Sequence, residues 1–185
     1  MSPQSIDEMI ESYFVAATTA VGVLFRQQLL GQTLIVVYAT IDACGLLGAP
    51  AGQDEATGAS FKAWVKKYLL CHPGLECNEV DLWAARCATL HTFRSSSKLS
   101  GAGAARELQY YTGDKGAPHI QQFIAFTKAH DGGKHLPVHY GDLMEAFFQG
   151  IKTFVPDLSA ACSASQEHAE RMRKVVQTHR HEPAS

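Results

Sequence analysis

The sequence has no excess of charge of either sign, because its 16 Lys and Arg residues nearly balance its 18 Asp and Glu residues. The net charge of −2 and the isoelectric point near 6.5 give no overall electrostatic reason for nucleic-acid binding. Any contact with RNA must therefore come from a local patch. The chain also has no phosphate-cradling glycine loop, no Gly-x-Ser-x-Gly motif and no dinucleotide-binding fingerprint.

The sequence has only five cysteines, an odd number, so a framework of disulfides is not expected. The N-terminus is acidic and amphipathic, unlike the basic and apolar segment of a secretory signal. Both observations fit reduced thiols in the cytosol. Two groups of potential metal ligands lie close together in the sequence: Cys71, His72 and Cys77, and His130, His135 and His139. Neither has the paired Cys-x-x-Cys spacing of a structural zinc site. We expect a cytoplasmic protein that uses no metal and no cofactor.

Long apolar runs are also absent. The longest, residues 34–50, is too short to span a membrane comfortably and contains Asp42, so we expect no membrane partner. A chain of 185 residues that is 46% hydrophobic is most simply one soluble domain with a sizeable core. No internal repeat or low-complexity linker divides it. We predict a single domain over residues 1–178 and a disordered tail over residues 179–185.

Helical signals dominate the first half of the chain. Ser5 and Glu8 have the spacing of a capping box, and Gly31 is the expected break after the first helix. Asn78 is a predicted N-cap. The expected helices run from Ser5 towards Leu30, from Thr33 to Leu47, from Thr57 to Leu70, and onward from Asn78.

The second half of the chain changes character. Residues 95–105 are small and polar, which indicates an exposed loop. Residues 106–112 and 119–126 have strand-like composition and are separated by a turn-prone segment, which predicts a hairpin, with a third strand near 136–138. Two helices should follow, one from Gly141 to about Pro156 and one from Asp157 towards Val176. The predicted fold is α+β, predominantly α: a helical bundle with a small antiparallel β insertion over about residues 106–139.

Arg86 and His91 stand out because they lie in a helical segment that is otherwise almost wholly apolar. At 100° per residue, Arg86 falls at the centre of the apolar face and needs a partner, since burying an unpaired charge costs several kcal/mol. His91 lies about 140° away, on a stripe of small residues with Ala84 and Ala88. Small side chains let another backbone approach, so the stripe predicts a helix–helix contact beside His91.

The pattern Arg86-x4-His91 resembles the motif of the HEPN superfamily, helical domains that include many metal-independent ribonucleases. The preceding segments add to the likeness. The order of these segments is similar to that in uncharacterised bacterial HEPN-like proteins: an apolar helix containing residues 38–43, then residues 61–68, then the motif helix. The resemblance covers about half the chain. At the position of Cys87, active members commonly carry a polar residue, often Asn.

The resemblance implies a mechanism and a dimer. His91 is expected to act as general base on the ribose 2′-OH or as general acid on the leaving 5′-oxygen, and Arg86 to neutralise charge on the phosphorus centre. The family typically places two such motifs across a homodimer. The products would be a 2′,3′-cyclic phosphate and a 5′-hydroxyl. Arg94, Lys98 and Arg106 follow the motif and are candidates for binding flanking phosphates of RNA, or alternatively solvated loop charges.

Asp42 is the acid most suited to support this site. Its helical neighbours are apolar, so it is expected to point inward and to pair with Arg86 from an adjacent helix. The pair has two interpretations. It is either a packed ion pair that fixes the bundle, or a support that orients Arg86 towards a phosphate. Cys87, beside the arginine, is expected to be a small packing residue at the same site.

The sequence thus predicts a HEPN-like metal-independent endoribonuclease, or a related RNA- or nucleotide-binding protein, that acts as a homodimer. The resemblance implies a context of bacterial toxin, stress or phage-defence systems, in which a protein antitoxin is a possible partner. The alternative is a non-catalytic helical scaffold in which Arg86 and His91 serve packing and assembly. The two differ in whether the His91 ring faces a solvent-reachable cleft.

Overall fold

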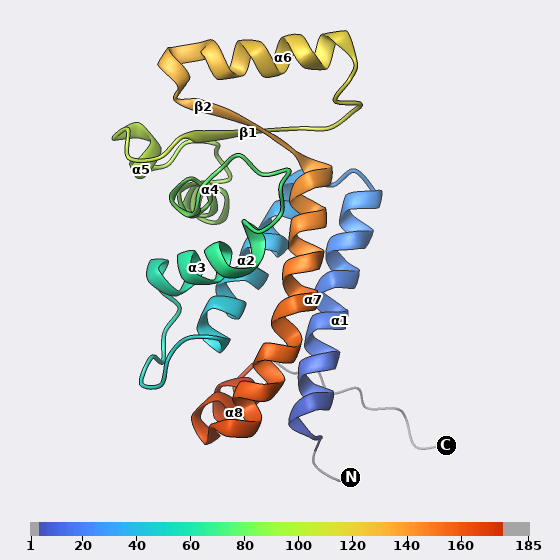
Figure 1. The fold of residues 1–185 in the computed structure, drawn as a ribbon, viewed down its shortest axis with the longest axis vertical. Helices are drawn as coiled ribbons and strands as arrows, with labels where there is room; N and C mark the ends of the chain where they lie inside the picture. Colours follow the sequence, from blue (N-terminus) through green and yellow to red (C-terminus); the bar gives the residue numbers. More distant parts are fainter. Residues whose placement is uncertain (1–3, 176–185) are drawn as a thin grey trace.

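Helices make up most of the computed structural model, which describes residues 4–175, and one small sheet completes it (Figure 1). The predicted tail over residues 179–185 lies outside the described residues. The helices are α1 Ile6–Arg26, α2 Leu30–Leu47, α3 Gly58–Trp64, α4 Glu79–Thr92, α5 Lys98–Gly101, α6 Pro118–Ala129, α7 Tyr140–Ala164 and α8 Gln166–Arg173. A π-helical turn, η1 Val65–Leu69, extends α3, and a 3₁₀ turn, η2 His130–Gly133, follows α6. The strands are β1 Glu107–Tyr111 and β2 His135–His139.

The long helices α1 and α7 run side by side, and α2 packs between them and the shorter helices α3 and α4 (Figure 1). Large side chains such as Tyr38, Phe61 and Phe147 are fully buried between these helices and form the core. Each contributes about 1.5–3 kcal/mol through burial. By length and composition alone α1 and α2 could each cross a membrane, and half of that stretch in α2 is buried in the protein.

Local capping sets where α1 and α4 begin, as the sequence predicted. The Ser5–Glu8 capping box is present at the start of α1, and the Asn78 side chain accepts hydrogen bonds from the backbone N–H groups of Val80 and Asp81. The predicted break at Gly31 is wrong. The chain turns earlier, where Gln28 adopts a positive φ of 57°, and Gly31 lies within α2.

The predicted antiparallel hairpin is also wrong. Residues 118–129 form helix α6 instead of a strand, and β1 and β2 pair in parallel, from Glu107 opposite His135 to Tyr111 opposite His139. Parallel strands need a crossover, and α6 supplies it. Ile120, Phe123 and Ile124 have helical i, i+3, i+4 spacing, and Pro118 occupies the favoured first position of the helix. In Figure 1 the strands separate α6 from the bundle.

The boundary between the last two helices lies further along the chain than predicted. The prediction that a helix ends near Pro156 is wrong, because α7 continues through Pro156 to Ala164, and Ser165 rather than Asp157 caps α8. Pro156 lacks a backbone N–H and costs one hydrogen bond within the helix. The burial of Phe154 and Leu158 on either side of it keeps the helix continuous.

Residues 95–105, predicted as an exposed loop, contain the short helix α5.

Replacing Pro156 should stabilise the fold. Pro156 is exposed in mid-helix, so Pro156→Ala restores an N–H donor and a better helix former without disturbing packing. We expect the free energy of unfolding, measured in urea, to rise by about 1–2 kcal/mol. The exposed neighbour Lys152→Ala should change it by less than about 0.5 kcal/mol. A loss of stability in Pro156→Ala would show that Pro156 itself supports the packing of α7.

Candidate functional site

Asp42 on α2 and Arg86 on α4 form an ion pair. Arg86 donates from Nε at 2.7 Å and from Nη2 at 2.5 Å to the same oxygen, Oδ2 of Asp42. The side chains of Asp42 and Arg86 are 15% and 18% exposed, so the ion pair is mostly buried but still reaches solvent. Burial lowers the pKa of Arg86, but the hydrogen bond and charge of Asp42 outweigh burial and raise the pKa above its ordinary value. The predicted pairing is confirmed, and Arg86 stays charged.

The third nitrogen of the guanidinium points to His91. Arg86 Nη1 lies 3.2 Å from His91 Nε2. The guanidinium also lies over the ring of Trp83, 5.0 Å from its centroid, in a cation–π contact that sequence analysis did not assign to the site. Because an arginine N–H donates and cannot accept, His91 Nε2 is the acceptor, and a neutral His91 carries its proton on Nδ1. Asp42, Arg86 and His91 therefore form one connected line of side chains.

His91 is exposed and lines a cavity of about 720 Å³. We call it the His91 cavity. Two of the predicted phosphate-binding residues, Arg94 and Lys98, line it as well, and so does Cys87. None of its lining residues is acidic. The complete lining is Trp83, Cys87, Ala88, His91, Thr92, Arg94, Ser96, Ser97, Lys98 and Leu99. The cavity suits an anionic ligand.

Arg106, the third predicted phosphate-binding residue, lies elsewhere. Its Nη2 donates to Oδ2 of Asp81 at 2.6 Å, and its backbone N–H donates to Oδ1 of the same carboxylate at 2.7 Å. Asp81 is buried at the start of α4, at the opposite end of the helix from His91. Arg106 therefore anchors the start of β1 to α4 and is not part of the His91 cavity.

The stripe of small residues is covered within the subunit. Ala84 and Ala88 are each only 2% exposed, because α4 packs against other elements of its own chain. The helix–helix contact expected beside His91 is thus supplied within the chain, and the stripe offers no free surface to a second copy. A dimer stays a prediction that must rest on other surfaces.

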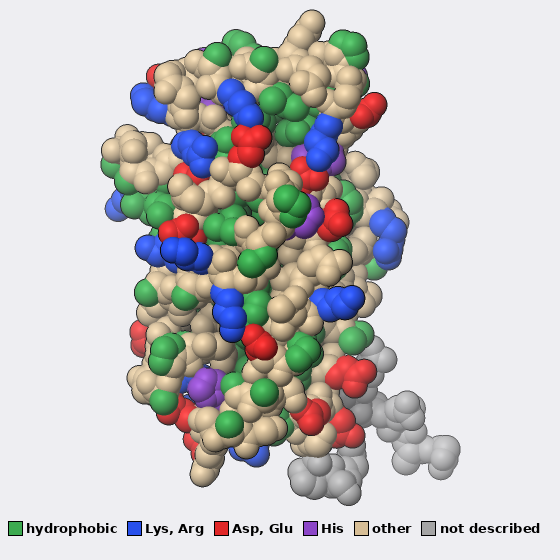
Figure 2. All heavy atoms as spheres, viewed as in Figure 1, with side chains coloured by type: hydrophobic (Ala, Val, Ile, Leu, Met, Phe, Trp, Pro, Cys, Tyr) green, Lys and Arg blue, Asp and Glu red, His purple; other side chains and the backbone are tan. Residues whose placement is uncertain are grey.

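Charges elsewhere on the surface are mixed. Figure 2 shows basic and acidic side chains interspersed over the face it presents, which agrees with the net charge of −2.

No group of three or more potential metal ligands is gathered among residues 4–175. His72, from one of the two groups considered in the sequence, faces Glu145 at 3.7 Å, and His139, from the other, hydrogen-bonds the carbonyl of Gly113.

No protein-family model matches the chain, and comparisons with curated proteins and with solved structures find no similar protein. The functional argument therefore rests on the residues themselves.

Removing the charge of Asp42 should loosen the contact between α2 and α4. Asp42→Asn leaves the guanidinium of Arg86 shielded from water without a counter-charge. We expect the free energy of unfolding in urea to fall by about 2–3 kcal/mol, less than for a fully buried pair because both side chains keep some exposure.

The matched control is Asp157→Asn, which breaks the exposed ion pair with Lys67 at 2.9 Å. Solvent screens that pair, so the variant should lose less than about 1 kcal/mol. Equal losses in Asp42→Asn and Asp157→Asn would mean that the Asp42–Arg86 pair does not hold the two helices together.

Proposed function

We propose that the protein is a HEPN-like, metal-independent endoribonuclease that works as a homodimer. The observation that carries the proposal is the contact between Arg86 Nη1 and His91 Nε2. His91 lines an exposed cavity together with the cations Arg94 and Lys98, and Arg86 reaches that cavity only through His91. A charged guanidinium beside a solvent-reachable imidazole is the pair that phosphate transesterification requires. The cavity has room for nucleotides, at about 720 Å³.

The reaction uses the RNA's own nucleophile. His91 Nε2 takes the proton from a ribose 2′-OH, the 2′-oxygen bonds to phosphorus, and the bond from phosphorus to the 5′-oxygen breaks. The leaving oxygen takes a proton from an imidazolium, and the products are a 2′,3′-cyclic phosphate and a 5′-hydroxyl. Arg86 turns its Nη1 donor to the phosphate as negative charge builds there, while Asp42 holds Nε and Nη2 in place.

A second imidazole is the reason to expect a dimer. The reaction needs a base and an acid on opposite sides of one phosphate, and the His91 cavity has a single histidine among its lining residues. His91 of the partner subunit would supply the acid. Arg94 and Lys98 would bind the phosphates that flank the scissile one, and their contribution to affinity would weaken as salt rises.

A scaffold without catalysis is the second candidate, and one observation favours it. Two of the three guanidinium nitrogens of Arg86 donate to Asp42, which is the geometry of a structural ion pair between helices. In that case the role of His91 would be to accept the remaining Arg86 donor at the end of α4.

Activity should survive metal removal and depend on His91. Wild-type protein, incubated with a mixed pool of single-stranded RNA in EDTA, is expected to release 2′,3′-cyclic phosphate ends. His91→Ala should lower the rate by at least about 100-fold, because general acid–base catalysis contributes about 10²–10⁴-fold. RNA with 2′-deoxy substitutions should resist cleavage, since it lacks the nucleophile.

His119→Ala is the matched control, because His119 is an exposed histidine on α6 and does not line the His91 cavity. It should cleave at the wild-type rate. Sedimentation of the three proteins shows whether each keeps the same oligomeric state. If wild type and His91→Ala are folded and equally inert across the pool, the scaffold replaces the nuclease.

A further inference from the structure

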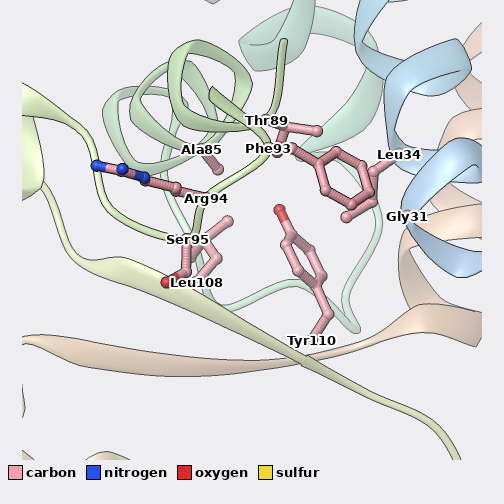
Figure 3. A pocket seen from close by; sticks show the side chains of 9 residues that line it. All are labelled: Gly31, Leu34, Ala85, Thr89, Phe93, Arg94, Ser95, Leu108 and Tyr110. Carbon is pink, nitrogen blue, oxygen red and sulfur yellow. The ribbon is translucent and has the colours of Figure 1, made fainter. Parts of the chain in front are cut away.

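A second cavity, of about 190 Å³, lies on the other side of Arg94, between α2, α4 and β1 (Figure 3). We call it the Phe93 cavity. Most of its walls are apolar side chains. The lining residues are Gly31, Leu34, Ala85, Thr89, Phe93, Arg94, Ser95, Leu108 and Tyr110. Arg94 lines both this cavity and the His91 cavity, so the two adjoin.

Phe93 is an aromatic ring held at the mouth of this cavity. It caps α4 in the left-handed conformation, with φ of 51°, and is 59% exposed. Its ring lies against the bare backbone of Gly31, where an added Cβ would come within 2.3 Å of the ring carbon Cζ. Glycine at position 31 therefore lets the ring rest on α2 at the edge of the cavity (Figure 3). An exposed aromatic face is a stacking surface for a base.

The hydroxyl of Tyr110 gives the apolar cavity a polar contact. The hydroxyl of Tyr110 points into the cavity (Figure 3) and is paired with the hydroxyl of Tyr38 behind it. Burial raises the pKa of Tyr110 well above its ordinary value, so the group stays protonated at neutral pH. One proton joins the two tyrosines, which leaves Tyr110 able to form one more hydrogen bond. Thr89 and Ser95 also line the cavity.

We propose that the Phe93 cavity binds the pyrimidine base of the nucleotide next to the phosphate in the His91 cavity, an inference that rests on the proposed ribonuclease function. An engineered cavity of about 150 Å³ holds one benzene ring, so 190 Å³ suits a single six-membered ring with its exocyclic oxygens better than the fused rings of a purine. The base stacks on Phe93, one of its oxygens meets the hydroxyl of Tyr110, and Arg94 bridges to the phosphate.

The test compares two nucleotides on the full chain by calorimetry. Uridine 3′-monophosphate should bind wild type at least about tenfold more tightly than adenosine 3′-monophosphate. Phe93→Ala should lose about tenfold in affinity for the uridine nucleotide, as expected for one base–aromatic stack. Phe93→Trp, which keeps a stacking ring, should retain that affinity. Phe126→Ala, at an exposed phenylalanine on α6, is the matched control and should bind like wild type.

The same variants are then given single-stranded RNA that contains every dinucleotide step. Wild type should cleave beside pyrimidines, and Phe93→Ala should lose that preference. Equal affinity of wild type for both nucleotides, or no effect of Phe93→Ala on affinity, overturns the inference even if RNA is cleaved in a His91-dependent way. Uridine nucleotide binding that depends on Phe93, without any cleavage of RNA, supports the base site and overturns the nuclease.

Discussion

The ion pair between Asp42 and Arg86 is the constraint on which the candidate site depends. It joins α2 to α4 and takes up two guanidinium nitrogens, which leaves the third to meet His91 at 3.2 Å. A second pair, between Asp81 and Arg106, fixes the first turn of α4 to the start of β1. Carboxylate–guanidinium pairs thus hold the motif helix at its first turn and at its middle. The pair that packs α2 against α4 also orients Arg86, the charge that the proposed function uses.

Helix α4 is also where the bundle meets the β1-α6-β2 unit. The His91 cavity opens beside the last turn of α4 and the segment after it, whereas the Phe93 cavity takes Leu108 and Tyr110 from β1. The strand insertion therefore has a place in the functional proposal, because it supplies one wall of the proposed base site. In a bundle that lacked it, Phe93 would have no opposing surface, and the proposed selectivity for a base would disappear.

The errors of prediction have different causes. Residues 119–126 are rich in β-branched and aromatic side chains, and that composition outweighed the helical spacing of Ile120, Phe123 and Ile124. Pro156 is a strong local signal for a helix end, but the burial of Phe154 and Leu158 along one face overrides it. The sequence around Arg106 did not indicate its partner, because Asp81 lies 25 residues earlier in the chain.

The sequence by itself determined what depends on near neighbours: the capping box of α1, the N-cap of α4, and the placement of Arg86 and His91 on one helix. The contact between Arg86 and His91 appeared only in the structure. It also indicated Asp42 as the partner of Arg86, since a charge in an apolar helix needs another. Only the tertiary structure decided the parallel pairing of the strands, the separation of Arg106 from the site, and the covering of Ala84 and Ala88. Those outcomes depend on contacts between residues distant in sequence, and local periodicity carries no information about which distant surface a helix face will meet.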